Sequence, residues 1–269
     1  MIDIWLLGYV VLGLVAGFFA GLLGVGGGAI MVPVLALMFS AQGFPDAHLM
    51  HLALGTSMAT IVFTSISSLR AHHKHGAVLW PVVKAIAPGI VVGTLLGAQI
   101  ASRVPTRPLA IFFSVFMAYV AVQMILNVKP KPSRELPGAL GMAGVGGFIG
   151  FISSLVAIGG GSLSVPFMTW CNVKMHNAIG TSAAIGLPIA LSGTVGYLWS
   201  GLRIESAGSL PPGSVGFVYL PALGAALVAS MLMAPVGAKV AHSLPVATIK
   251  KIFAGVIILL LAKMLHGLF

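Results

Sequence analysis

Residues 17–35, GFFAGLLGVGGGAIMVPVL, recur in related form as GFISSLVAIGGGSLSVPFM at residues 150–168. The two glycine triplets fall on one another in this match, and so do the prolines that follow them. Two more pairs of stretches match in the same order: HLALGTS at 51–57 with HNAIGTS at 176–182, and GAQIASRVP at 97–105 with GAKVAHSLP at 237–245. The chain is therefore predicted to consist of two homologous repeats, 1–128 and 137–269, joined by a basic linker at 129–136.

The composition of the repeats is that of a membrane protein. Hydrophobic residues make up 58% of the 269 residues and charged residues only 7%, whereas soluble domains carry roughly 25% charged residues. A helix needs ~20 apolar residues to cross a bilayer, and long apolar runs cover 4–23, 48–69, 77–101, 106–127, 137–158, 177–199, 214–241 and 247–268. The first run lacks the basic start of a signal peptide and is interpreted as a span. The sequence predicts an all-α, multi-pass protein of the bacterial inner (plasma) membrane.

Two shorter apolar runs, 28–40 and 161–171, decide between two topologies, because each begins at the end of a glycine triplet. If the triplets only kink a helix, the chain has eight spans and its basic loop residues divide evenly between the two sides. If each triplet reverses the chain, ten segments result, and nine basic residues share one side: Arg70, Lys74, Lys129, Lys131, Arg134, Lys174, Lys239, Lys250 and Lys251. Only the second arrangement obeys the positive-inside rule.

The ten-segment arrangement predicts two inverted halves. It gives each repeat about five transmembrane or re-entrant helices, and an odd number per repeat inverts the second repeat relative to the first. The loops at 70–76 and 127–136 are expected to be cytoplasmic, and both termini are expected on the opposite side. The runs 28–40 and 161–171 are short for full spans, so re-entrant helices are the alternative there.

The net charge of +10 is also explained by topology. Basic loops hold a membrane protein's cytoplasmic side in place and contact anionic lipid. A positive potential that attracts an anionic solute is compatible with this explanation. Nucleic-acid binding would need a soluble basic domain, and no polar stretch is long enough to form one. The single cysteine, Cys171, allows neither an intrachain disulfide nor a cysteine-rich metal site.

The glycine triplets are candidates for a substrate site. Their members are Gly26, Gly27 and Gly28 in the first repeat and Gly159, Gly160 and Gly161 in the second. Consecutive glycines expose backbone N–H groups, and the helix that each triplet begins adds a positive dipole end, which favours an anion. The alternative is close helix packing, for which small residues are also selected in membranes.

The repeated His-x-x-x-Gly-Thr-Ser motif is the second candidate. Its members are His51, Gly55, Thr56 and Ser57, and then His176, Gly180, Thr181 and Ser182. A glycine can loosen the helix, and the hydroxyls that follow can donate hydrogen bonds to an anion. The alternatives are that the hydroxyls bond their own helix and that the histidines are packed or interfacial residues.

Carboxylate chemistry inside the membrane is not expected, because Asp3, Asp46, Glu135 and Glu205 all lie near segment ends or in loops. Proton coupling, if it occurs, is expected to depend on His51 or His176, or on Lys84. The tract 72–75, HHKH, is interpreted as a solvated basic loop in preference to a metal site. We find no nucleotide-binding, zinc-protease or serine-hydrolase motif, so no catalytic residue, metal or cofactor is predicted.

The paired motifs resemble those of the TauE/SafE family of membrane transporters. The residues that carry this resemblance are the two glycine triplets, each closed by Val-Pro (32–33 and 165–166) and followed by His-x-x-x-Gly-Thr-Ser. The resemblance covers nearly the whole chain and implies transport of sulfite, organosulfonates or related sulfur oxyanions. One departure is that Ala157 stands where the first repeat has Gly24, so the two loops are not expected to be equivalent.

The function expected from these observations is secondary transport of a small sulfur-containing anion by alternating access between inverted halves. A passive anion channel would share the fold and is the alternative. A metal-ion transporter using the histidine tract is a weaker one, and an intramembrane enzyme would need reactive groups that the sequence lacks. The sequence indicates no oligomeric state.

Overall fold

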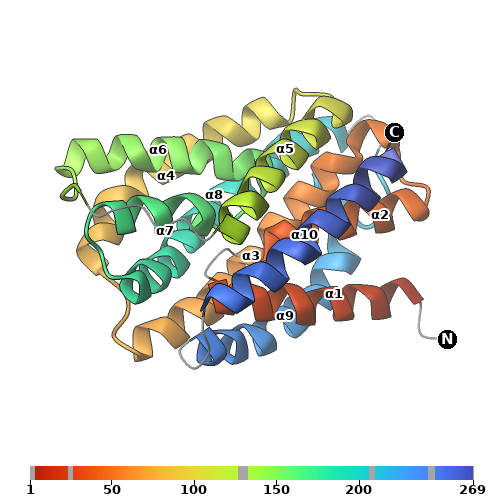
Figure 1. Ribbon diagram of the computed structural model, residues 1–269. Coiled ribbons are helices and arrows are strands. Elements are labelled where there is room, and N and C mark those ends of the chain that lie inside the picture. The colour runs from red at the N-terminus through yellow and green to blue at the C-terminus, as the bar shows by residue number, and fades with distance from the viewer. Residues whose placement is uncertain (1–3, 24–26, 127–132, 206–209, 242–245, 269) are drawn as a thin grey trace.

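The computed structural model describes residues 4–23, 27–126, 133–205, 210–241 and 246–268. Within these residues the chain forms ten α-helices, one short 3-10 helix and a two-stranded hairpin (Figure 1). Five of these α-helices precede residues 129–136 and five follow them. The predicted all-α class is confirmed.

The elements before the linker are α1 (Ile4–Leu23), α2 (Gly28–Ala41), the 3-10 helix η1 (Asp46–His48), α3 (Leu49–Lys74), α4 (Trp80–Ala101) and α5 (Thr106–Leu126). Those after it are α6 (Ala139–Val156), α7 (Gly161–Trp170), α8 (Met175–Glu205), β1 (Ser214–Val215), β2 (Val218–Tyr219), α9 (Leu220–Ala241) and α10 (Val246–Leu268).

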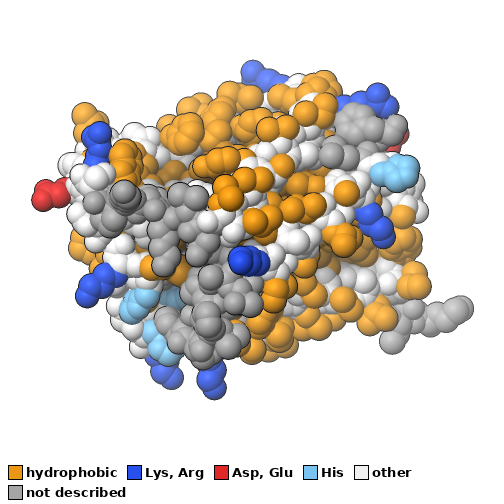
Figure 2. All heavy atoms as spheres, viewed as in Figure 1, with side chains coloured by type: hydrophobic (Ala, Val, Ile, Leu, Met, Phe, Trp, Pro, Cys, Tyr) orange, Lys and Arg blue, Asp and Glu red, His pale blue; other side chains and the backbone are white. Residues whose placement is uncertain are grey.

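Most of these helices can cross a bilayer. Seven are long and apolar enough by length and composition, namely α1, α3, α4, α5, α6, α8 and α9. Large hydrophobic side chains remain exposed on several of them, including Leu140, Val115 and Leu232. Hydrophobic side chains cover much of the face shown in Figure 2, and most of its Lys and Arg side chains lie toward the two ends. The chain is a multi-pass integral membrane protein, as predicted.

The helices that follow the glycine triplets are too short to cross. Helix α2 has 14 residues and α7 has 10, which correspond to ~21 and ~15 Å at ~1.5 Å per residue. The hydrocarbon core is ~30 Å thick. Because α1 ends at Leu23 and α6 at Val156, each triplet separates two helices and does not merely kink one.

Helices α3 and α8 form the centre of the molecule. They pack on each other, and α3 also packs on α9 while α8 packs on α4. They have 26 and 31 residues, and their membrane-spanning segments are the most buried of the seven. Most polar side chains within these membrane-spanning segments are therefore inside the protein and not in lipid.

Glycines allow α1 to pack closely on α9 and α4 to pack closely on α6, and Gly17 and Gly150 are two of them. A Cβ atom on Gly17 would overlap the carbonyl oxygen of Ser230, and a Cβ on Gly150 would lie 2.5 Å from that of Ile90. Gly17 and Gly150 occupy matching positions of the repeated stretches. Ile90 and Ser230 also match, because each lies seven residues before its matched stretch, which begins at 97 in one half and at 237 in the other. The same backbone contact is thus made twice, once between α1 of the first half and α9 of the second, and once between α6 of the second half and α4 of the first.

Two stretches differ from the sequence prediction. Residues 214–219, expected to begin a helix, form the β1–β2 hairpin, in which Gly216 has φ 53°. The predicted loop at 70–76 is mostly helix, because α3 continues to Lys74. The interpretation of 72–75 as a solvated loop is wrong for His72, which is 1% exposed and places Nε2 3.3 Å from the Gly21 carbonyl oxygen.

Helices α1 and α10 share one end of the molecule. Helix α1 begins and α10 ends at the right-hand end of Figure 1, and the connection between α3 and α4 lies at the left-hand end. This is the relative placement expected from ten segments, whereas the side that faces the cytoplasm stays a prediction.

Candidate functional site

The two glycine loops, residues 26–28 and 159–161, have the same backbone geometry where both are described. The residue that precedes α2 is Gly27, with φ 77° and ψ −11°, and the one that precedes α7 is Gly160, with φ 78° and ψ −11°. This left-handed conformation favours glycine. Gly26 lies outside the described residues. Each loop therefore begins a helix inside the protein, as the sequence predicted.

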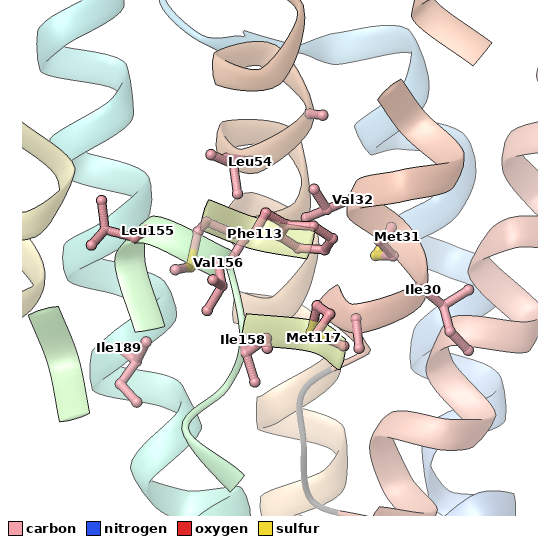
Figure 3. Packing of buried hydrophobic residues seen from close by; sticks show 14 of the residues in the cluster. Ile30, Met31, Val32, Leu54, Phe113, Met117, Leu155, Val156, Ile158 and Ile189 are labelled. Atoms are coloured by element: carbon pink, nitrogen blue, oxygen red, sulfur yellow. The ribbon is translucent and has the colours of Figure 1, made fainter. Parts of the chain in front are cut away.

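The first glycine loop lies against the segment that leads into the second. A Cβ atom on Gly28 would overlap the carbonyl oxygen of Ala157, which itself adopts a left-handed conformation with φ 47°. Figure 3 shows the surrounding apolar side chains, all from one buried cluster: Ile30, Met31, Val32, Leu54, Phe113, Met117, Leu155, Val156, Ile158 and Ile189. Hydrocarbon therefore packs closely around the loops in this conformation.

Each threonine of the repeated motif accepts a hydrogen bond from a connecting segment of the opposite half. The Tyr219 N–H donates to Thr56 Oγ1 at 2.9 Å, and the Leu79 N–H donates to Thr181 Oγ1 at 2.9 Å. Tyr219 directly precedes α9 and Leu79 directly precedes α4, so the two bonds are equivalent. Each threonine keeps its own O–H to donate.

The glycines of the motif permit the same contacts. A Cβ on Gly55 would overlap the carbonyl oxygen of Phe217, and a Cβ on Gly180 would lie 2.6 Å from the Ala77 Cβ. Both motifs thus pack against the segment that leads into the fourth helix of the other half. The structure does not bring the two motifs together at one place.

The serines of the motif lie beside the short helices. Ser164, in the first turn of α7, donates to Ser182 Oγ at 3.0 Å. The position in α2 that matches Ser164 is Met31, which offers no hydroxyl. Ser57 is fully buried, and its Oγ has no hydrogen-bond partner among the described residues. The Ser57 hydroxyl is therefore available to a ligand, as are the O–H groups of the two threonines.

The two histidines of the motif are not equivalent. His51 is buried, and its Nε2 lies 3.2 Å from the Ala101 carbonyl oxygen and 3.0 Å from that of Val104. These two acceptors favour the tautomer with a proton on Nε2. His176 is exposed at the start of α8. The histidines therefore do not share a site, and His51 holds the C-terminal end of α4.

A row of polar residues on α3 was not singled out from the sequence. Thr56, Thr60, Thr64, Ser68 and His72 occur at every fourth position and are all buried. Such spacing places side chains along one face of a helix, and this signal was available in the sequence. Thr64 and Ser68 of this row also line a small cavity of about 10 Å³, which has room for about one water molecule.

The histidine tract does not form a metal centre in the part of the chain that the structure describes. No three His, Cys, Asp or Glu side chains come together there to hold an ion. His73 accepts a hydrogen bond from the Trp80 indole at 3.3 Å at the surface.

The sequence matches one known family over most of its length. The sulfite exporter TauE/SafE family matches residues 9–264. A probable membrane transporter protein of Haemophilus influenzae is 36% identical over 247 residues, which are 90% of this chain and 91% of that protein. The probable membrane transporter protein YunE of Bacillus subtilis is 29% identical, over 71% of this chain and 78% of its own length.

More distant relatives have the same description. The probable membrane transporter protein MJ0441 of Methanocaldococcus jannaschii is 25% identical, over 79% of this chain and 77% of its own length. No solved structure matches the chain. The family consists of membrane transporters and not of enzymes, and its bacterial members support a location in the plasma membrane. With ten α-helices among the described residues, two glycine loops and a match over residues 9–264, the chain belongs to the sulfite exporter TauE/SafE family of membrane transporters.

Proposed function

We propose that this transporter moves a small sulfur-containing anion, such as sulfite or a sulfonate, by alternating access between two inverted halves. The observation that carries the proposal is the pair of glycine loops. They have matching left-handed glycines at the starts of two short helices, and Gly28 of the first loop packs against the Ala157 carbonyl, two residues before the second loop.

Helix directions support the inversion of the halves. Along α1 and α9, the residue numbers of the contacting pairs increase in the same direction: Gly13 contacts Ala226, and Gly17 contacts Ser230. The same holds along α4 and α6, where Gly89 contacts Ala143 and Gly93 contacts Gly147. Each pair is therefore parallel and joins the first helix of one half to the fourth helix of the other. The first and fourth segments of an alternating half run in opposite directions, so α1 and α6 are antiparallel, as inverted halves require.

The glycine loops support an anionic substrate. The N-terminal ends of α2 and α7 carry unsatisfied N–H groups and a partial positive charge. They supply this potential without a buried lysine or arginine, which would be costly in the membrane. We propose the glycines of both loops as the substrate shell, and we propose that the Gly-Thr-Ser hydroxyls of the two halves, which lie apart in this structure, complete it in turn as the halves alternate. Sulfur chemistry comes from the description of the family.

A difference between the halves supports two alternating states. Helix α10 packs along α2 in the first half. In the second half, the corresponding region of α6 and α7 lines a groove of about 640 Å³ whose walls include Phe148, Leu163 and Phe167. If the two halves exchange these arrangements, the accessible side of the membrane changes with them.

The test is solute flux in proteoliposomes with sulfite, sulfoacetate, taurine and thiosulfate, with and without a pH gradient. The proposal predicts saturable flux of at least one sulfur anion and accelerated exchange when the same anion is present on both sides. Flux that never saturates and shows no exchange would indicate a channel. Flux of divalent metal ions alone would overturn the anion assignment. Gly27→Val and Gly160→Val should block flux while membrane insertion continues.

A further inference from the structure

The groove between α6 and α7 opens toward the membrane. It has a volume of about 640 Å³, and apolar side chains form its walls. Phe148 of α6 is 62% exposed, and Trp170, the last residue of α7, is 39% exposed. Helix α6 is long and apolar enough to cross a bilayer, so hydrocarbon is what surrounds these side chains.

The groove has the depth of one leaflet. It extends from Leu163, near the start of α7, to Trp170 at its end. The Ser133 N–H donates to the Trp170 carbonyl oxygen at 3.2 Å, so this end of the groove lies on the linker side of the molecule. Helix α7 has 10 residues, which correspond to ~15 Å, half of the ~30 Å hydrocarbon core. An acyl chain of the leaflet on the linker side therefore fits the groove in length.

The matching face of the first half is covered. Leu163 is half-buried, whereas Ile30, which occupies its position in the repeat, is 2% exposed. Helix α10 packs along α2, but α5, the fifth helix of the other half, does not pack in this way on α7. Trp170 matches Leu37, so the aromatic residue at the end of the groove also belongs to the second half alone. One such groove per chain is expected in this conformation.

A positive charge lies at the end of the groove. The guanidinium carbon of Arg134 is 5.1 Å from the centroid of the Trp170 ring, within the range of a cation–π contact. The Trp170 indole N–H donates to Ser133 Oγ at 2.9 Å, and the Asn172 amide donates to the Arg134 carbonyl oxygen at 3.4 Å. These contacts hold Arg134 beside a side chain that lines the groove.

This end of the groove suits an anionic headgroup. A guanidinium group binds phosphate through two parallel hydrogen bonds. Lys174, exposed in the connection from α7 to α8, adds a second positive charge, and Glu135 is the one acid nearby in the sequence. Tryptophan is typical of the membrane interface, and the cytoplasmic leaflet, where this side is predicted to lie, carries anionic lipid.

We propose that the groove between α6 and α7 binds one anionic phospholipid, with an acyl chain along the two helices and the headgroup phosphate on Arg134. A second copy of the chain fits less well, because only four Asp and Glu residues in 269 could meet Arg134. The lipid site does not rest on the proposed transport function.

The test is native mass spectrometry of the purified, delipidated full-length protein, titrated with phosphatidylglycerol or with phosphatidylcholine of the same acyl chains. Wild type should bind one phosphatidylglycerol about fivefold more tightly than phosphatidylcholine, the equivalent of ~1 kcal/mol for one basic residue. Arg134→Gln should remove this preference. Gly144→Leu should weaken the binding of both lipids roughly tenfold, because a few CH₂ groups lose their place in the groove.

Two features of the chain make these variants interpretable. Gly144 lines the groove, and a Cβ there would meet nothing within 4 Å, so leucine enters the groove without a backbone clash. Arg203→Gln is the matched control, because the Arg203 guanidinium carbon lies 5.3 Å from the centroid of the Trp199 ring, which does not line the groove. This control should keep the wild-type preference.

The site is overturned if wild type shows no saturable lipid binding or binds the two lipids equally. It is also overturned if Gly144→Leu, eluting as folded protein, binds both lipids as wild type does. An equal loss of preference in Arg134→Gln and Arg203→Gln would assign the effect to general surface charge. A lipid-free dimer that Gly144→Leu dissociates would make a second copy the occupant.

Discussion

Replacing Thr56 by valine tests the bonds that join the halves. Thr56 is fully buried, and its Oγ1 accepts the Tyr219 N–H at 2.9 Å. Valine has nearly the shape of threonine but cannot accept a hydrogen bond. The change therefore leaves a half-buried backbone donor without its partner just before α9 begins, while the packing around position 56 is kept.

The expected cost follows from that orphaned donor. An unsatisfied buried donor costs ~1–3 kcal/mol. In a chain of this size, 1 kcal/mol lowers the melting temperature by roughly 2–4 °C, so Thr56→Val should melt roughly 2–12 °C below wild type. Thr181→Val should have an equivalent effect, because the Leu79 N–H makes the matching bond at 2.9 Å. The measurement is thermal unfolding of the detergent-purified protein, followed by tryptophan fluorescence.

Thr56→Ser is the control, because it keeps the hydroxyl and removes only a methyl group. It should melt closer to wild type than Thr56→Val does. If Thr56→Val melts at the wild-type temperature, or if serine is as damaging as valine, the hydrogen bond is not what stabilises this contact. A loss of substrate affinity in Thr56→Val without any loss of stability would instead favour a direct role of the hydroxyl in the substrate shell.

Three further predictions concern the glycine loops, the topology and the cysteine. Gly160→Ala should destabilise the protein by roughly 1–2 kcal/mol in thermal unfolding because φ is 78° there, whereas Gly224→Ala, with open space around it in α9, should be neutral or stabilising. Cysteines introduced at His75 and Asp46, both exposed, should be labelled from opposite sides of the membrane, and labelling of both from one side contradicts the ten-segment topology. Cys171 is 5% exposed, and burial raises the pKa of its thiol, an effect that Arg134 partly offsets. The reactive thiolate is therefore scarce at neutral pH, so maleimide should label native Cys171 slowly at pH 7 and faster as the pH rises toward 9; labelling as fast as that of an exposed cysteine would refute the burial argument.

Much of the fold could be predicted because the membrane permits few solutions. A chain with 58% hydrophobic residues must satisfy its backbone within helices, and the apolar runs place those helices to within a few residues. The repeated stretches predicted two related sets of five segments. Prediction failed where a side chain's environment depends on segments distant in the sequence. An example is His72, whose side chain is buried with Nε2 3.3 Å from the Gly21 carbonyl oxygen.

The sequence by itself determined that the protein lies in a membrane, that it contains a repeat, and that each glycine triplet interrupts a helix. These properties depend on composition and on residues adjacent in the chain. Only the tertiary structure decided what each polar group meets. Thr56 and Tyr219 are 163 positions apart, and Ser65 of α3 lies 3.8 Å from the position of a Cβ on Gly186 of α8. A motif specifies which donors and acceptors are available, but packing between distant segments determines whether they hold the halves together, remain unpaired or line a cavity.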